Sequence, residues 1–153
     1  MFQLLQQHQF KVKLSKCSFA QQQLYYLGHV LNPYGVSTDS SKLSIIQNWS
    51  SPTNTKELRS FLDIAGYYRR FVQNFGMITR PLNDLLKKNT LFIWTETTEQ
   101  AFQLLKQSLI SAPVLTLPNF NEPFVVETDA SDYGIGAVLQ QNGHPIAFVS
   151  KAL

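Results

Sequence analysis

A single carboxylate lies in a position suited to divalent-metal chemistry. Asp129 follows a run of strand-forming residues at 124–128, and small residues, including Gly134 and Gly136, come soon after it. Carboxylates bind divalent cations well, and small neighbours would let a bulky phosphodiester approach closely. The alternative is an ordinary turn aspartate, whose side chain accepts hydrogen bonds from nearby backbone groups. These residues alone leave both interpretations open.

A second candidate site is the polar face of a predicted helix. Apolar residues within 58–68 recur at the spacing of one helix face, after a Thr-Asn-Thr cluster suited to a helix start. The opposite face carries Arg59, Asp63, Tyr67 and Arg70, which are spaced four, four and three residues apart. Two guanidinium groups with a ring between them suit the sugars and phosphates of a duplex. Alternatively, this is a solvated face on which Arg59 pairs with Asp63.

Short helices and strands must position these residues. The alternation and composition predict strands at residues 11–14, 24–31 (broken by Gly28), 124–128, 134–139 and 146–149. Turns are expected at 32–35, 131–132 and 142–143. Helices are expected at the start of the chain (2–9), after caps at Asp39 and Thr95, across 58–68, and from Ile78 to Lys87-Lys88. The sequence therefore predicts an α+β fold with small antiparallel sheets at both ends and a helical middle.

Composition excludes several classes of protein. With 44% apolar and 15% charged residues, the 153-residue chain is not of the disordered type and can form one domain or pieces of two. Cys17 is the only cysteine, which excludes an intramolecular disulfide and a multi-thiolate zinc site. The three histidines, His8, His29 and His144, show no metal-site spacing. No apolar run approaches the roughly 18 residues of a membrane span, so no membrane partner is expected.

Charge is distributed unevenly along the chain. Residues 1–53 carry four lysines and one acid, and residues 54–90 carry seven basic and three acidic side chains. Residues 91–153 carry two lysines and six acids. This division favours polyanion binding by the first 90 residues and a different task for the remainder, although small numbers also permit ordinary fluctuation between two solvated surfaces.

Taken together, the motifs resemble the pol polyprotein of gypsy-type long-terminal-repeat retrotransposons. The resemblance covers essentially the whole chain, in the order KCSFA, YLGHVLNPYGV, PTNTKELRSFL, GYYRRFVQNFG, PLNDLLKK, FIWTETTEQAF, SAPVLTLP and TDASDYGIGAVLQ. It implies four parts: 1–37, the end of a reverse-transcriptase palm; 38–90, the thumb; 91–120, a lead-in helix and strand; and 121–153, an incomplete ribonuclease H-like domain. A chain truncated at both ends is the expectation.

The resemblance also assigns roles to residues. In this family the primer grip is a hairpin that positions the primer's 3′ end. The residues that match it here are Tyr26, Leu27, Gly28 and His29. The thumb helix would lie along the template-primer and carries Arg59, Tyr67 and Arg70. Asp129 stands in the place of the first metal-binding, catalytic carboxylate of ribonuclease H. Asp63 departs from the pattern, since the family more often has Gly there.

Other departures limit what the chain is expected to do alone. The family's polymerase aspartates belong upstream, and no Asp precedes Asp39 here. Ribonuclease H chemistry needs about four carboxylates around two metal ions, and only Asp129 is in place. The resemblance therefore implies Mg²⁺ in the intact polyprotein, not held by this chain alone. Expected partners are an RNA/DNA hybrid or a DNA primer on an RNA template, with the missing palm and ribonuclease H portions.

The predicted function is that of a fragment of reverse transcriptase and ribonuclease H that binds template-primer and is inactive alone. The family resemblance places such proteins in cytoplasmic particles. Two alternatives remain open. One is an inert remnant of a transposable element, and the other is a non-enzymatic nucleic-acid-binding module whose contacts would be Arg59, Arg69, Arg70, Arg80, Lys87 and Lys88.

Overall fold

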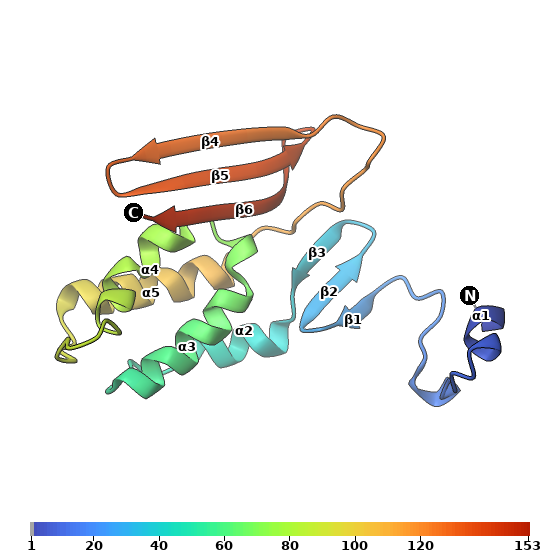
Figure 1. Ribbon diagram of the computed structural model, residues 1–153, viewed down its shortest axis with the longest axis horizontal. Helices are drawn as coiled ribbons and strands as arrows, with labels where there is room; N and C mark the ends of the chain where they lie inside the picture. Colours follow the sequence, from blue (N-terminus) through green and yellow to red (C-terminus); the bar gives the residue numbers. More distant parts are fainter. Residues whose placement is uncertain (1) are drawn as a thin grey trace.

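Two three-stranded antiparallel sheets flank a group of helices (Figure 1). The computed structural model describes residues 2–153. The helices are α1 (Phe2–Gln7), α2 (Ser40–Gln47), α3 (Thr55–Tyr67), α4 (Phe75–Asp84), α5 (Glu96–Ile110) and the 3-10 turns η1 (Leu14–Lys16) and η2 (Arg69–Phe71). The strands are β1 (Leu24–Tyr26), β2 (His29–Asn32), β3 (Gly35–Thr38), β4 (Val125–Ser131), β5 (Gly134–Gln141) and β6 (His144–Ala152). The α+β prediction is confirmed.

The first sheet is a meander in the order β1-β2-β3. Tyr26 pairs with His29, so Leu27 and Gly28 form a two-residue turn, with φ angles of 48° and 74°. Positive φ at both positions is the geometry that matches the twist of a tight hairpin, and glycine adopts it without strain. The predicted run at 24–31 is therefore two strands, joined at the point where Gly28 interrupts it.

Helix starts follow the predicted caps. The Asp39 carboxylate accepts a hydrogen bond from the Ser41 N–H at the start of α2, and Asn54 does the same for Glu57 at the start of α3. Thr95 and Thr98 form a reciprocal capping box at the start of α5. Each cap satisfies backbone donors that have no partner within the helix, which explains why these three boundaries are readable from sequence.

The core lies between α2, α3, α4 and α5. Phe61 of α3 and Phe102 of α5 are fully buried, and their ring centroids are 4.6 Å apart. Other fully buried side chains around them are Ile46, Leu58, Leu82 and Leu105. Backbone hydrogen bonds between Val36 and Leu115, 2.7 and 2.8 Å long, join the first sheet to the segment after α5. The core is therefore continuous from the first sheet to α5.

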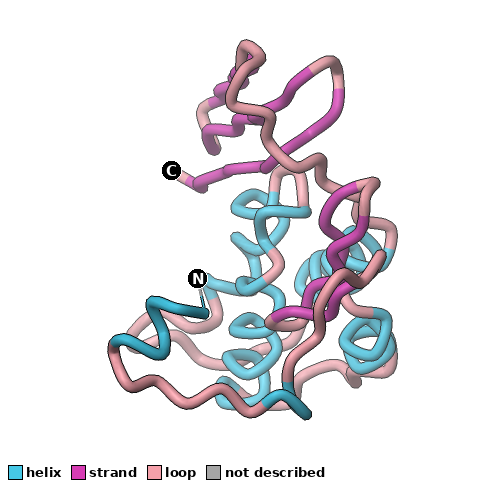
Figure 2. The backbone as a smooth tube through the Cα atoms, turned by 90° about the vertical axis from the view of Figure 1, so that its right-hand side faces the viewer, coloured by secondary structure: helices cyan, strands magenta, loops and turns pink. Residues whose placement is uncertain are grey.

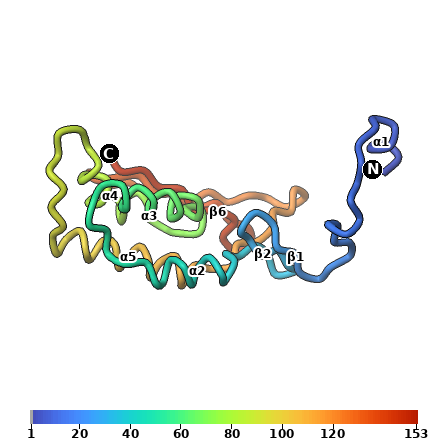
Figure 3. The backbone as a smooth tube through the Cα atoms, turned by 90° about the horizontal axis from the view of Figure 1, so that it is seen from below, coloured from blue at the N-terminus to red at the C-terminus, as the bar shows by residue number. Residues whose placement is uncertain are grey.

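The second sheet, in the order β4-β5-β6, lies at one end of the helices (Figure 2). Its strand β6 contacts α4 and η2. The Gly76 N–H in α4 donates to Ser150 Oγ in β6 at 2.7 Å, so this sheet is fixed to the helices by a direct bond. The segment before β1 extends away from the helices (Figure 3), and no residue of α1 is buried.

Three local predictions are wrong in detail. Residues 11–13 form no strand and lead into η1, because alternation alone supplies no neighbouring strand to pair with. Ser131 pairs with Gly134, so the turn is at 132–133 and not at 131–132. The helix predicted to reach Lys87-Lys88 ends at Asp84. None of the helices in residues 2–153 is both long and apolar enough for a membrane span.

The contact between Phe61 and Phe102 can be tested by truncation. Phe102→Ala should lower the free energy of unfolding by about 3–5 kcal/mol, because it removes a fully buried ring and leaves a cavity. Leu104→Ala is the matched control, since Leu104 is on the same helix but 53% exposed, and it should cost less than about 0.5 kcal/mol. Urea unfolding measures both values. Equal losses would contradict the assigned core.

Candidate nucleic-acid interface

Two consecutive tyrosines hold the turn that was predicted to be the primer grip. The Tyr67 hydroxyl donates to the Leu27 carbonyl at 2.5 Å, and the Tyr68 hydroxyl donates to the Gly28 carbonyl at 3.1 Å. The Asp39 N–H also donates to the Gly28 carbonyl, at 3.1 Å. Burial raises the pKa of Tyr68, so its hydroxyl keeps the proton that it donates. The turn is therefore fixed to the C-terminal end of α3.

This arrangement differs from the prediction for Tyr67. The sequence placed its ring on a free face between two arginines, whereas the structure stacks that ring on His29 and uses its hydroxyl to bind the turn. About half of the side chain, 51%, is still exposed. Tyr68 ends the apolar helix face predicted within 58–68, and that pattern gave no indication of its hydrogen bond across 40 residues.

His29 is half-buried and lies against aromatic rings. Its ring is parallel to Tyr67 at a centroid distance of 5.4 Å and edge-on to Tyr68 at 5.6 Å. Its Nδ1 atom is buried and has no hydrogen-bond partner within residues 2–153. Burial, and then the positive charge of Arg70, lower the pKa of His29. The uncharged imidazole therefore fits this site, since a proton would add charge next to a guanidinium.

The predicted basic residues are exposed, except Arg80, which is half-buried over the Tyr133 ring, and they do not share one helix face. Arg59 and Asp63 lie on α3, whereas Arg70 lies in η2, because α3 ends at Tyr67. The alternative pairing of Arg59 with Asp63 does not occur: within residues 2–153 the ion pair found is Lys87 with Asp84, at 2.6 Å. The guanidinium of Arg70 lies 5.6 Å from the centre of the Phe71 ring. The arginines of α3 and η2 are thus free of acidic partners.

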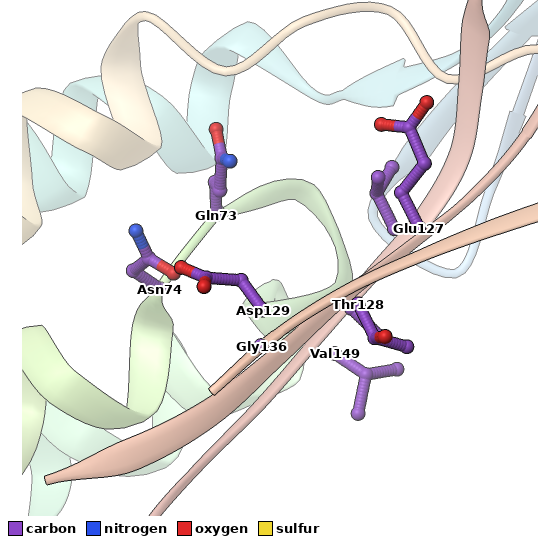
Figure 4. A pocket seen from close by; sticks show the side chains of 9 residues that line it. Gln73, Asn74, Glu127, Thr128, Asp129, Gly136 and Val149 are labelled. Carbon is purple, nitrogen blue, oxygen red and sulfur yellow. The ribbon is translucent and has the colours of Figure 1, made fainter. Parts of the chain in front are cut away.

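Asp129 lies within β4, not in a turn at its end. It pairs with Gly136 of β5, and no hydrogen bond to its carboxylate is found in the described chain, which argues against the turn-aspartate alternative. A pocket of about 210 Å³ adjoins it, and Gln73 and Asn74 from the loop before α4 contribute to the lining (Figure 4). The sequence gave no indication that these two amides would lie beside Asp129.

The carboxylates present do not complete a metal site. Glu127 lies two residues before Asp129 on the same face of β4 and lines the same pocket. Across residues 2–153, no group of three His, Cys, Asp or Glu side chains is placed to hold a metal ion. One or two carboxylates fall short of the set that a two-metal site requires, so no chemical step is assigned to a metal on this chain.

Comparisons with known proteins relate the chain to reverse transcriptases and transposon polyproteins. A family described as the RNase H-like domain found in reverse transcriptase matches residues 94–153. The chain is 43% identical over 145 residues to the retrovirus-related Pol polyprotein from transposon 297 of Drosophila melanogaster, covering 94% of this chain. It is 50% identical over 125 residues to an uncharacterized mitochondrial protein of Arabidopsis thaliana, covering 80% of this chain and 78% of that protein. The chain is homologous to retrovirus-related Pol polyproteins of transposons.

The chain spans 14% of the length of the transposon 297 polyprotein. Its fold is similar to the foamy viral protease-reverse transcriptase in complex with dsDNA, with a TM-score of 0.84 and 28% identity, over 99% of this chain and 33% of that one. The same enzyme in complex with an RNA/DNA hybrid gives a TM-score of 0.81 and 28% identity, over 93% of this chain and 20% of that one. The family prediction is confirmed, and the chain is homologous to the reverse-transcriptase and RNase H-like region of Pol.

Acidification should weaken the attachment of the Leu27–Gly28 turn to the end of α3. Because the folded state lowers the pKa of His29 below its ordinary 6.5, the unfolded chain binds the proton more readily. The stability contributed by neutral His29 is thus full above about pH 6.5 and is lost as the pH falls through the lowered value. The titratable or charged groups that face the ring are Arg70, Tyr67 and Tyr68.

Urea unfolding at pH 7.5 and 5.5 tests this expectation. Wild type should lose more stability on acidification than His29→Phe, which keeps an aromatic ring and removes the titrating nitrogen. Identical losses in both proteins would show that His29 does not contribute to the pH dependence.

Proposed function

We propose that this chain is the template-primer-binding part of a longer reverse transcriptase and ribonuclease H polyprotein, and that it catalyses neither reaction alone. The observation that carries the proposal is that hydrogen bonds from Tyr67 and Tyr68 fix the Leu27–Gly28 turn. Beside it, α3 and η2 carry arginines that form no ion pair within residues 2–153. Tyr67 and Tyr68 bind the turn, while Arg69 and Arg70 follow immediately in the chain.

The turn offers a rigid surface for a primer. Tyr26 and Leu27 are 60% and 67% exposed, although the backbone that carries them is fixed by hydrogen bonds. Exposed aromatic and apolar side chains on a fixed backbone can pack against a sugar or a terminal base at low entropic cost. This supports the role of Tyr26, Leu27, Gly28 and His29 as a primer grip.

The arginines supply the complementary charge. Arg59, Arg69 and Arg70 are exposed, and none forms an ion pair within residues 2–153. Cations of this kind bind phosphates and release condensed counterions, which gives affinity that depends on salt. The foamy viral relatives in complex with dsDNA and with an RNA/DNA hybrid support a nucleic-acid partner of this class.

The acidic residues support inactivity of the isolated chain. No Asp precedes Asp39 in the sequence, so the aspartates on which a polymerase centre depends would come from elsewhere in the polyprotein. We propose that Asp129 supplies one ligand for Mg²⁺ when the remaining ribonuclease H portion is present.

Salt dependence and charge removal test the binding proposal. The chain should bind a fluorescein-labelled RNA/DNA hybrid with an affinity that falls as salt rises, and Arg70→Ala should reduce the slope of log affinity against log salt by about one. Fluorescence anisotropy over a salt series measures both effects.

The matched control is Lys87→Ala. Because Lys87 is already paired with Asp84, its removal should change the slope less than Arg70→Ala does. Affinity that ignores salt would count against the proposal, and absence of binding would favour an inert remnant.

The role of Asp129 is tested in the longer polyprotein. Loss of a group that only orients a metal ligand costs roughly 10- to 100-fold in activity. Asp129→Asn should reduce Mg²⁺-dependent cleavage of the RNA strand by more than this. The Asp132→Asn variant, at the neighbouring turn, is the control. A normal cleavage rate in Asp129→Asn would remove Asp129 from the site.

A further inference from the structure

The pocket at Asp129 is bounded by a loop that comes from the helical part of the chain. Asn74 occupies the N-cap position of α4 with φ 57° and ψ 25°, and its side chain makes no capping hydrogen bond. The helix start is satisfied by its backbone instead, since the Asn74 carbonyl accepts from the N–H groups of Met77 and Ile78 at 2.9 and 3.0 Å. The side-chain amide is therefore available to a ligand.

The amide of Asn74 lies over the strand pair that carries Asp129. A Cβ atom built on Gly136 would be 3.2 Å from Asn74 Oδ1, and Gly136 is the direct partner of Asp129 in the sheet. Figure 4 shows the Asn74 amide and the Asp129 carboxylate close together on one side of the strands. The absence of a side chain at Gly136 leaves room for the amide at this place.

The loop is held rigidly on both sides of Asn74. Phe71 and Val72 before it are 1% and 2% exposed, and Gly76 after it is bonded to Ser150. Asn74 itself is exposed and has a left-handed backbone, a conformation that asparagine adopts more readily than most residues other than glycine. A polar group presented in this way binds without losing much conformational entropy.

The chemistry of the pocket suits a sugar hydroxyl better than a phosphate. Glu127 and Asp129 would repel a phosphate that approached without a cation, while an amide both donates and accepts hydrogen bonds. The 2′-hydroxyl, which is also both donor and acceptor, is the group that distinguishes RNA from DNA. Arg69 and Arg70 lie only four to five residues upstream and can bind the phosphates of the same strand.

We infer that Asn74 is a specificity residue, whose amide binds a 2′-hydroxyl of the RNA strand beside Asp129, with Gln73 lining the same pocket. The thumb-like part of the chain would then contribute directly to recognition at the ribonuclease H-like sheet. This inference rests on the proposed function, because it requires that the chain bind an RNA/DNA hybrid.

Variants at Asn74 separate the amide from the backbone. Asn74→Gly keeps a residue that tolerates the positive φ and removes only the amide. Asn74→Asp keeps the shape of the side chain and replaces its donor with a negative charge. The affinity of each full 153-residue chain is measured by anisotropy at fixed salt for three duplexes of one sequence: an RNA/DNA hybrid, the same hybrid with a 2′-fluoro RNA strand, and a DNA duplex.

Wild type is expected to bind the RNA/DNA hybrid about three- to tenfold more tightly than Asn74→Gly or Asn74→Asp, the range for loss of one hydrogen bond. Wild type and Asn74→Gly should bind the 2′-fluoro hybrid equally, and likewise the DNA duplex, whereas the added negative charge of Asn74→Asp should weaken the binding of all three duplexes. Replacing ribonucleotides by deoxyribonucleotides one at a time should remove the wild-type advantage at a single position.

Other outcomes overturn the inference in distinguishable ways. If Asn74→Gly weakens all three duplexes alike, Asn74 acts on the structure and not on the hydroxyl. If wild type and Asn74→Gly bind each of the three duplexes with the same affinity, the inference fails while the proposed function stands. If wild type binds no duplex, the proposed function fails and the inference fails with it.

Discussion

The packing of Phe61 against Phe102 is the contact on which the other features depend. It joins α3 to α5 at the centre of the buried cluster, and thereby fixes the direction in which α3 approaches the first sheet. Backbone bonds between Val36 and Leu115 close the same unit at its other side. Without this core, neither sheet has a fixed support, because a small sheet needs a buried hydrophobic face or a helix packed against it to be stable.

The segment from the end of α3 to the start of α4 connects two candidate sites. At one end Tyr67 and Tyr68 hold the Leu27–Gly28 turn. At the other end Asn74 lies at the Asp129 pocket, and the bond from Gly76 to Ser150 fixes the second sheet. The exposed arginines of η2 lie between these ends. A duplex bound to this segment would therefore meet a turn, a cationic stretch and an acidic pocket in a fixed order.

Local features were predictable from sequence, and long-range ones were not. The caps at Asp39, Asn54 and Thr95 follow from side chains that bond to backbone a few residues away, and the turn at 142–143 follows from an Asn-Gly pair. The tyrosine contacts span 40 residues, and the approach of Asn74 to Gly136 joins two different parts of the chain. Spacing along one helix carries no information about such contacts. For the same reason the family resemblance located Asp129 but not the amides beside it.

A thermal melt of the purified chain, followed by circular dichroism at low salt with and without a short RNA/DNA hybrid, tests the account most directly. The account predicts one cooperative transition, because the core is continuous, and a midpoint that rises with hybrid concentration, because a ligand bound to the native state stabilises it. A broad transition that does not respond to the hybrid would contradict both the single core and the binding surface on it.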